Sequence, residues 1–188
     1  MNNGQRTGFL VALALLVAAC FTTLPASRAA DMPVDDSEEV SQLLADVKTE
    51  AYQLERDAED LSAWARSKNM SWESHTAKVN LIREHVNKAG ELLTELNNAR
   101  DEGSPWQQKA IDEIYPALKS LADNTQTVMN LLGERKHLIR MKPEYREYAT
   151  TNHTLARELR VLVTDYIDYG KHNAEFQRLQ QKLQVVKD

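Results

Sequence analysis

The chain contains a single cysteine, Cys20, among 188 residues. Disulfide frameworks, thiolate zinc sites, iron–sulfur clusters and c-type haem attachment all need more cysteines than this and are excluded. A chain of this length can bury a core large enough to fold without covalent cross-links. We therefore expect one domain after an N-terminal leader.

Signals for β-structure are also lacking. The chain has 6 glycines and 5 prolines, and most of them lie near the N-terminus or between helical stretches. No run alternates β-branched residues with polar ones, which is the pattern of a half-buried strand. These absences favour an all-α fold.

The chain has fewer basic than acidic residues. The chain carries 23 lysines and arginines against 28 acidic residues, which gives a net charge of −5. Such a chain is a poor match for nucleic acid, whose phosphates attract Lys and Arg, and for anionic lipid surfaces. We expect no nucleic-acid partner.

Motifs of catalysis are missing as well. The sequence has no glycine-rich phosphate loop, no Gly-x-Ser-x-Gly and no His-Glu-x-x-His. No nucleophile and base stand at a local spacing that would pair them. The sequence therefore predicts a non-enzymatic protein without a cofactor.

The N-terminus, by contrast, has a clear pattern. One cation, Arg6, precedes an apolar run over residues 9–19, and small residues follow Pro25. This order is typical of a secretory signal peptide, with cleavage expected after Ala29. The run is shorter than the roughly 20 residues that a membrane span needs. We expect an exported bacterial protein, periplasmic or extracellular, without a transmembrane segment in its mature form.

Cys20 suggests an alternative cleavage site for this leader. Val17-Ala18-Ala19-Cys20 resembles the lipobox, in which a cysteine after a small residue becomes lipidated at the new N-terminus. More than one acyl chain on Cys20 would anchor the protein stably to a membrane. The alternative is thus a lipid-anchored envelope lipoprotein.

The rest of the chain reads as a flexible segment (30–38) and a four-helix bundle (39–185). Apolar residues recur at alternating steps of four and three, which is a heptad pattern typical of left-handed helix packing. Short connections place sequence neighbours antiparallel, in an up-down-up-down order. The four helices are expected at about residues 36–68, 71–100, 104–140 and 143–183.

Two local features refine this prediction. Ser104, Pro105 and Gln107 form the start of the third helix, with Gln107 completing a capping box. The heptad positions of the fourth helix are expected to face the core along its whole length. They are Tyr145, Tyr148, Asn152, Leu155, Leu159, Leu162, Tyr166, Tyr169, Asn173, Phe176 and Leu183.

Histidines raise the alternative of a metal- or haem-binding bundle. The expected topology places four of them in one half of the bundle. Carboxylate-bridged di-iron bundles need Glu-x-x-His on two helices, whereas Glu134-x-x-His137 is the only such spacing here. The candidate ligands are therefore weak ones: His75, His85, His137, His153 and Glu134.

Together these features predict an exported interaction or scaffold protein of the cell envelope. It would act by binding a protein partner or by self-association, through surfaces of its helices. The metal- or haem-binding bundle and the lipoprotein anchored at Cys20 remain the two alternatives.

Overall fold

The computed structural model describes residues 35–67, 69–134 and 142–185, which belong to one structural unit. The expected signal peptide, with Cys20 and Ala29, lies outside the described residues, as does His137. The proposed metal and lipid sites at these positions are therefore not described.

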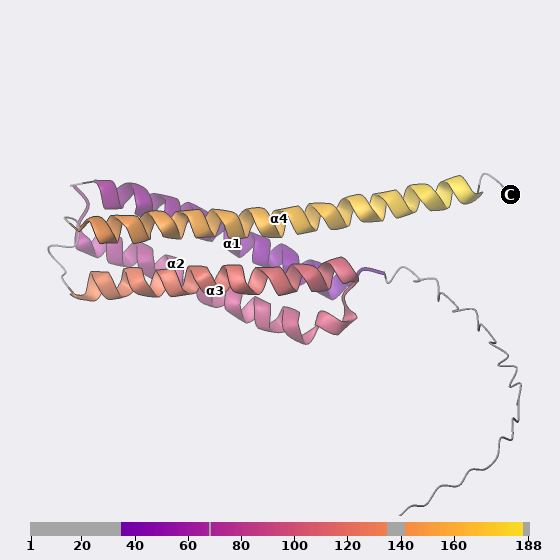
Figure 1. The fold of residues 1–188 in the computed structure, drawn as a ribbon, viewed down its shortest axis with the longest axis horizontal. Coiled ribbons are helices and arrows are strands. Elements are labelled where there is room, and N and C mark those ends of the chain that lie inside the picture. The colour runs from indigo at the N-terminus through magenta and orange to yellow at the C-terminus, as the bar shows by residue number, and fades with distance from the viewer. Residues whose placement is uncertain (1–34, 68, 135–141, 186–188) are drawn as a thin grey trace, which may run out of the picture. The chain divides into compact units, whose positions relative to one another are not determined.

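The described residues form four α-helices and contain no β-strand (Figure 1). This confirms the all-α, four-helix fold predicted from the sequence. Residues 135–140, which end the third expected helix, lie outside the described part. The helices are α1 (Glu38–Arg66), α2 (Trp72–Asn98), α3 (Pro105–Glu134) and α4 (Pro143–Val185), with a short 3-10 helix, η1 (Arg100–Glu102), after α2.

Serine hydroxyls cap the first two helices. The Ser37 Oγ accepts a hydrogen bond from the Val40 amide at 3.3 Å, and Ser71 Oγ accepts one from Ser74 at 3.2 Å. Each bond satisfies an amide that has no partner within its helix. Glu38 and Glu39 add negative charge to the first turn of α1, where the helix dipole favours it.

Each helix packs mainly against two others, because α1 and α3 both contact α2 and α4. Contacting residues run in opposite numerical order along neighbouring helices. Between α1 and α2, Glu50 meets His85 and Asp57 meets Lys78. The same order holds between α1 and α4, where Glu55 pairs with Arg160 and Ser62 with Thr150.

The core is built from the heptad positions of the first three helices together with buried residues of α4: Tyr145, Ala149, Ala156, Leu159 and Val163. Each fully buried leucine or valine there contributes about 1.5–3 kcal/mol by leaving water. None of the described helices is long and apolar enough to cross a membrane. On α1 every predicted heptad position is buried: Val40, Leu44, Val47, Ala51, Leu54, Ala58, Leu61 and Ala65.

The heptad prediction for α4 is wrong toward its C-terminal end. Tyr169, Phe176 and Leu183 are 57%, 60% and 67% exposed instead of buried. For Phe176 and Leu183 the physical reason is length, because α4 has 43 residues and each of the other helices has 27–30. Tyr169 still lies beside Trp106 of α3, but it faces an open groove. Figure 1 shows α4 continuing past the end of the bundle, where no helix lies beside it.

Candidate functional site

His75 and Tyr145 form a buried pair at one end of the bundle. The His75 Nδ1 lies 2.8 Å from the Tyr145 hydroxyl, and the Trp64 ring meets His75 edge-on at 6.4 Å between centroids. Burial raises the pKa of Tyr145, so its hydroxyl keeps its proton. This arrangement is that of a packed, hydrogen-bonded core histidine.

The other candidate ligands that the structure describes are His85, His153 and Glu134, and they lie at separate places. His153 is half-buried in a shallow groove lined by α4 residues only, and Glu134 is exposed at the end of α3. His85 lies between α1 and α2. Within the described ranges, no three His, Cys, Asp or Glu side chains are grouped so that they could hold a metal ion.

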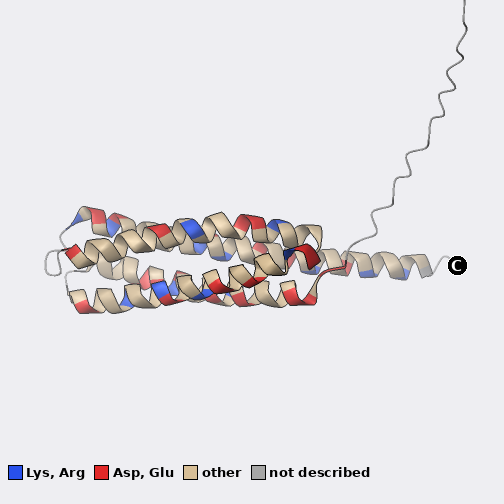
Figure 2. Ribbon diagram, turned by 90° about the horizontal axis from the view of Figure 1, so that it is seen from below, with Lys and Arg blue, Asp and Glu red and all other residues tan. Residues whose placement is uncertain are grey.

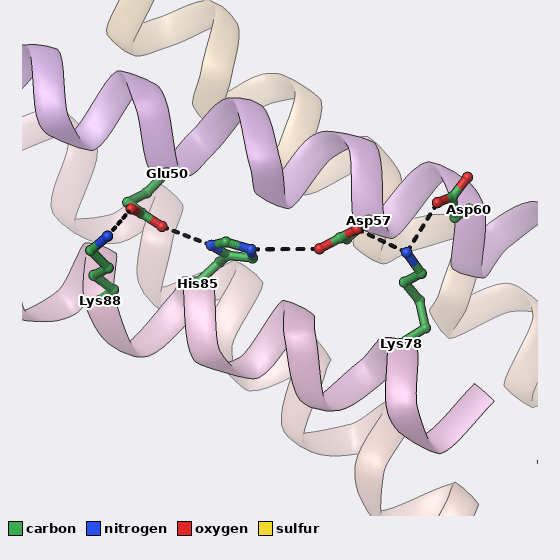
Figure 3. Close-up of polar contacts among 6 residues, drawn as sticks. All are labelled: Glu50, Asp57, Asp60, Lys78, His85 and Lys88. Atoms are coloured by element: carbon green, nitrogen blue, oxygen red, sulfur yellow. Dashed lines mark hydrogen bonds and ion pairs between the residues drawn. The ribbon is translucent and has the colours of Figure 1, made fainter. Parts of the chain in front are cut away.

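His85 instead belongs to a row of charged side chains between α1 and α2, which we call the polar chain (Figure 3). The His85 Nδ1 lies 2.7 Å from the Glu50 Oε2, and its Nε2 lies 3.6 Å from the Asp57 Oδ2. Lysines extend the row at both ends. Its members in spatial order are Lys88, Glu50, His85, Asp57, Lys78 and Asp60.

Neighbouring charges decide the ionisation of the polar chain. Burial of Glu50 opposes its negative charge, but hydrogen bonds from Lys88 and His85 outweigh burial and lower its pKa. Burial also opposes the charge of Lys78, but Asp57 and Asp60 outweigh it and raise the lysine pKa. Both groups are therefore charged at neutral pH.

The polar chain joins α1 to α2. Lys78 Nζ lies 2.9 Å from Asp57 and 3.0 Å from Asp60, and Lys88 Nζ lies 2.6 Å from Glu50. Each of these ion pairs connects a side chain of α1 with one of α2, so the row aligns the two helices.

The most unusual surface is the C-terminal part of α4, residues 171–185, which we call the free segment. From Lys171 to Gln184 its side chains are exposed, except for the half-buried Asn173 and Gln177. It rises about 1.5 Å per residue and so extends roughly 22 Å. Its first residues, Lys171 and Ala174, still border a groove shared with the start of α1, whereas its far end has no helix beside it in Figure 1.

Large apolar residues follow one another along α4 at intervals of seven. Tyr148, Leu155 and Leu162 are partly buried and pack against the core. The same row continues on the exposed part of α4 as Tyr169, Phe176 and Leu183, with Leu179 also exposed beside it. The apolar face that helps to hold the bundle together thus continues where no helix covers it.

Trp106 closes the bundle at the base of the free segment. Its Nε1 donates a hydrogen bond to the Asp36 Oδ1 at 2.6 Å, and its ring meets Tyr169 edge-on at 6.3 Å. The ring also fills the space beside Gly170, where an added Cβ would lie 2.4 Å from the indole. A glycine is needed here because the aromatic ring approaches the α4 backbone so closely.

Gln107 joins the starts of α1 and α3 at this end. Its Oε1 accepts hydrogen bonds from the Ser104 amide at 2.8 Å and from the Ser37 amide at 2.9 Å. Its Nε2 donates to the Ser37 carbonyl at 2.8 Å. The Ser104 hydroxyl donates to Asp36, so only the glutamine half of the expected capping box is present.

An open groove of about 450 Å³ lies beside Trp106. Tyr166 and Tyr169 form its aromatic wall with Trp106, and Lys109 and Asp165 also line it. Burial and a hydrogen bond with Glu113 raise the pKa of Tyr166 to about 12, so the groove presents a neutral phenol. The groove is apolar enough to receive an aliphatic side chain.

Charge differs between the free segment and the end of the bundle from which it leaves. The free segment carries Lys171, Arg178 and Lys182 against Glu175. Figure 2 shows acidic residues at the adjacent bundle end. The exposed acidic side chains there are Asp35, Asp36, Glu38, Glu39, Asp101 and Glu102.

The sequence could have indicated the free segment by one signal. The fourth expected helix (143–183) is longer than the first and third expected helices (36–68 and 104–140), against which α4 packs, so they could not cover all of it. Heptad spacing alone did not reveal that the end of α4 is exposed.

No protein-family model, curated protein or solved structure matches the chain.

Proposed function

We propose that the chain is an exported, non-enzymatic helical-bundle protein that acts as an interaction module in the cell envelope. The observation that carries this proposal is the free segment, where an apolar row leaves the bundle and stays exposed. Contiguous apolar surface of this kind is typical of a binding face, since water solvates it poorly.

We also propose that the bundle has the antiparallel up-down-up-down order. The opposite numerical order of contacting residues on α1 and α2, and on α1 and α4, supports it. Heptad spacing supports a left-handed crossing of the helices.

The partner is a protein with an apolar stripe of its own. A helix laid along Tyr169, Phe176 and Leu183 would place apolar residues at intervals of three and four against this row. Lys171, Arg178 and Lys182 lie on the other side of this helix, so they stay in water and leave the apolar row to the partner.

A photo-crosslinking amino acid at position 176 tests this proposal in the cell that makes the protein. We expect covalent adducts from position 176 and none from position 81, where Leu81 is an exposed leucine on α2. Equal adduct yields at the two positions, or none at either, would refute an interaction through the free segment.

A further inference from the structure

We propose that the groove beside Trp106 is a binding site for a small organic cation of the quaternary ammonium class. This inference is independent of the protein partner proposed above, because it concerns a site for a small molecule. The groove has a volume of about 450 Å³, which lies within the range of small-ligand pockets. Its walls combine three aromatic rings with an unpaired carboxylate, and these two features together select a cation.

The three aromatic side chains come from two helices. Trp106 lies at the start of α3, whereas Tyr166 and Tyr169 lie about one turn apart on α4. The ring planes of Trp106 and Tyr169 are inclined at 66°, with 6.3 Å between the ring centroids. The rings therefore form a corner rather than a flat stack. Aromatic faces attract cations because the ring quadrupole is negative over the face, so a compact cation in this corner would be held by both rings.

The indole of Trp106 is fixed in place beside a negative charge. Its Nε1 donates a hydrogen bond to the Asp36 Oδ1 at 2.6 Å, and its ring packs against Gly170. The Ser104 hydroxyl donates to the same Asp36 oxygen at 2.7 Å, which holds the carboxylate there. The carboxylate adds its own attraction for a cation to that of the ring, and a fixed ring loses little freedom when a ligand binds.

The charges around the groove favour a cation over an anion. Asp165 lines the groove, and within the described residues its carboxylate has no hydrogen bond or ion pair. Lys109 also lines the groove, but its Nζ lies 3.7 Å from the Glu113 Oε1, so a carboxylate of α3 already balances its charge. Acidic residues gather at this end of the bundle in Figure 2 and add to the attraction.

The acceptors in the groove favour a quaternary ammonium over a primary one. A primary ammonium has three N–H donors, which need partners when it leaves water. Lys78 shows this need, because its Nζ binds Asp57 and Asp60 and also lies 5.2 Å from the centroid of Trp64. Among the described residues that line the groove, only Asp165 carries a carboxylate. A quaternary ammonium has no N–H to satisfy, so its methyl groups can contact the rings while its charge faces this carboxylate.

A choline titration of the full chain, followed by NMR, tests this site. The indole N–H signal of Trp106 reports on the groove, and the signals of Trp64 and Trp72, which lie outside it, serve as references. We expect choline to shift the Trp106 signal saturably. The neutral carbon analogue of choline, in which a tert-butyl group replaces the trimethylammonium group, should not. No shift with choline, or an equal shift with the neutral analogue, would overturn the proposal.

Two substitutions separate the charge from the ring contact. Asp165→Asn and Tyr169→Leu should each weaken choline binding about fivefold, because each removes one of the attractions at an exposed site. Glu175→Gln and Tyr52→Leu make the same kinds of change at exposed positions away from the groove, so both should bind choline like the wild type. Choline binding that is the same in the groove variants and in these controls would refute the site.

A second ligand tests the class of cation. Arginine amide stands for a cationic side chain of a peptide, and its guanidinium needs several acceptors. We expect it to shift the Trp106 signal more weakly than choline does at the same concentration. Tighter binding of arginine amide than of choline would refute the assignment to a quaternary ammonium.

Discussion

Gly170 has no side chain, and this allows Trp106 to pack against the backbone of α4 at the base of the free segment. The indole of Trp106 occupies the place where a Cβ would be, while its Nε1 is held by Asp36. Glycine in a helix interior costs about 1 kcal/mol relative to alanine. At this position, close packing of the ring against the backbone offsets that cost.

Gly170→Ala should therefore destabilise the protein by about 1–3 kcal/mol, because the indole must move away from the new methyl group. Gly90→Ala is the matched control, since an added Cβ at Gly90 meets nothing within 4 Å. That change should stabilise α2 by up to about 1 kcal/mol. Urea unfolding measures both, and equal effects of the two substitutions would contradict this account of Trp106.

Glu50 should make stability depend on pH in the acid range. Lys88 and His85 lower its pKa in the folded protein below the usual value of about 4.3. The unfolded chain then binds more protons in this range, so the contribution of Glu50 is present above about pH 4.5 and is lost as pH falls through the folded pKa.

Glu50→Gln removes this titration and is the variant to compare. We expect its stability deficit relative to the wild type to be largest near neutral pH and to shrink below pH 4. Unfolding free energies measured by denaturant at several pH values give the difference directly. A deficit that stays constant down to pH 3 would show that the ionisation of Glu50 does not contribute to stability.

The sequence predicted contacts between neighbouring residues but not contacts between residues far apart in the chain. The sequence indicated Gln107 as part of a capping box, because that contact is local. Its bonds to Ser37 depend on two helix starts meeting in space. Glu50 and Asp57 also lie far from His85 in the sequence, so residue spacing could not identify their contacts with it.

At the scale of elements, the four helices were predictable because heptad spacing and capping residues act locally. The burial of α1 followed directly from its spacing. The exposure of α4 did not, because a heptad row shows that a helix has an apolar face and not what covers it. Helix length relative to its neighbours decides that question for Phe176 and Leu183.

Amide hydrogen exchange should distinguish the two parts of α4. We expect amides of residues 145–166 to be protected, because these residues pack in the bundle. Amides of residues 178–185 should exchange faster, because no described helix of the chain packs beside them. Equal protection of the two parts would contradict the view that α4 leaves the bundle at its C-terminal end.

At the scale of the whole molecule, composition predicted the fold class and limited the range of functions. One cysteine, a net charge of −5 and the lack of strand patterns favour a helical bundle without thiolate metal sites or nucleic-acid binding. Composition cannot say where the proposed binding takes place, whereas the exposed apolar row on α4 gives a location for it.

Export is a separate prediction for the whole chain. Expressed in a bacterium with its N-terminus intact, the mature protein should have an intact mass that begins at Ala30. It should also carry no stoichiometric metal. A mass that begins at a lipid-modified Cys20 would instead support the envelope lipoprotein, and bound metal or haem would require the histidine sites to be reconsidered.

The measurement that tests the account most directly is a photo-crosslinking scan along the free segment in the cell that makes the protein. The account predicts strong adducts at positions 169, 176 and 183, which share one helix face, and weak ones at 174 and 181 on the opposite face. Uniform adducts at all five positions, or none at any, would contradict the claim that this apolar row is the working surface of the protein.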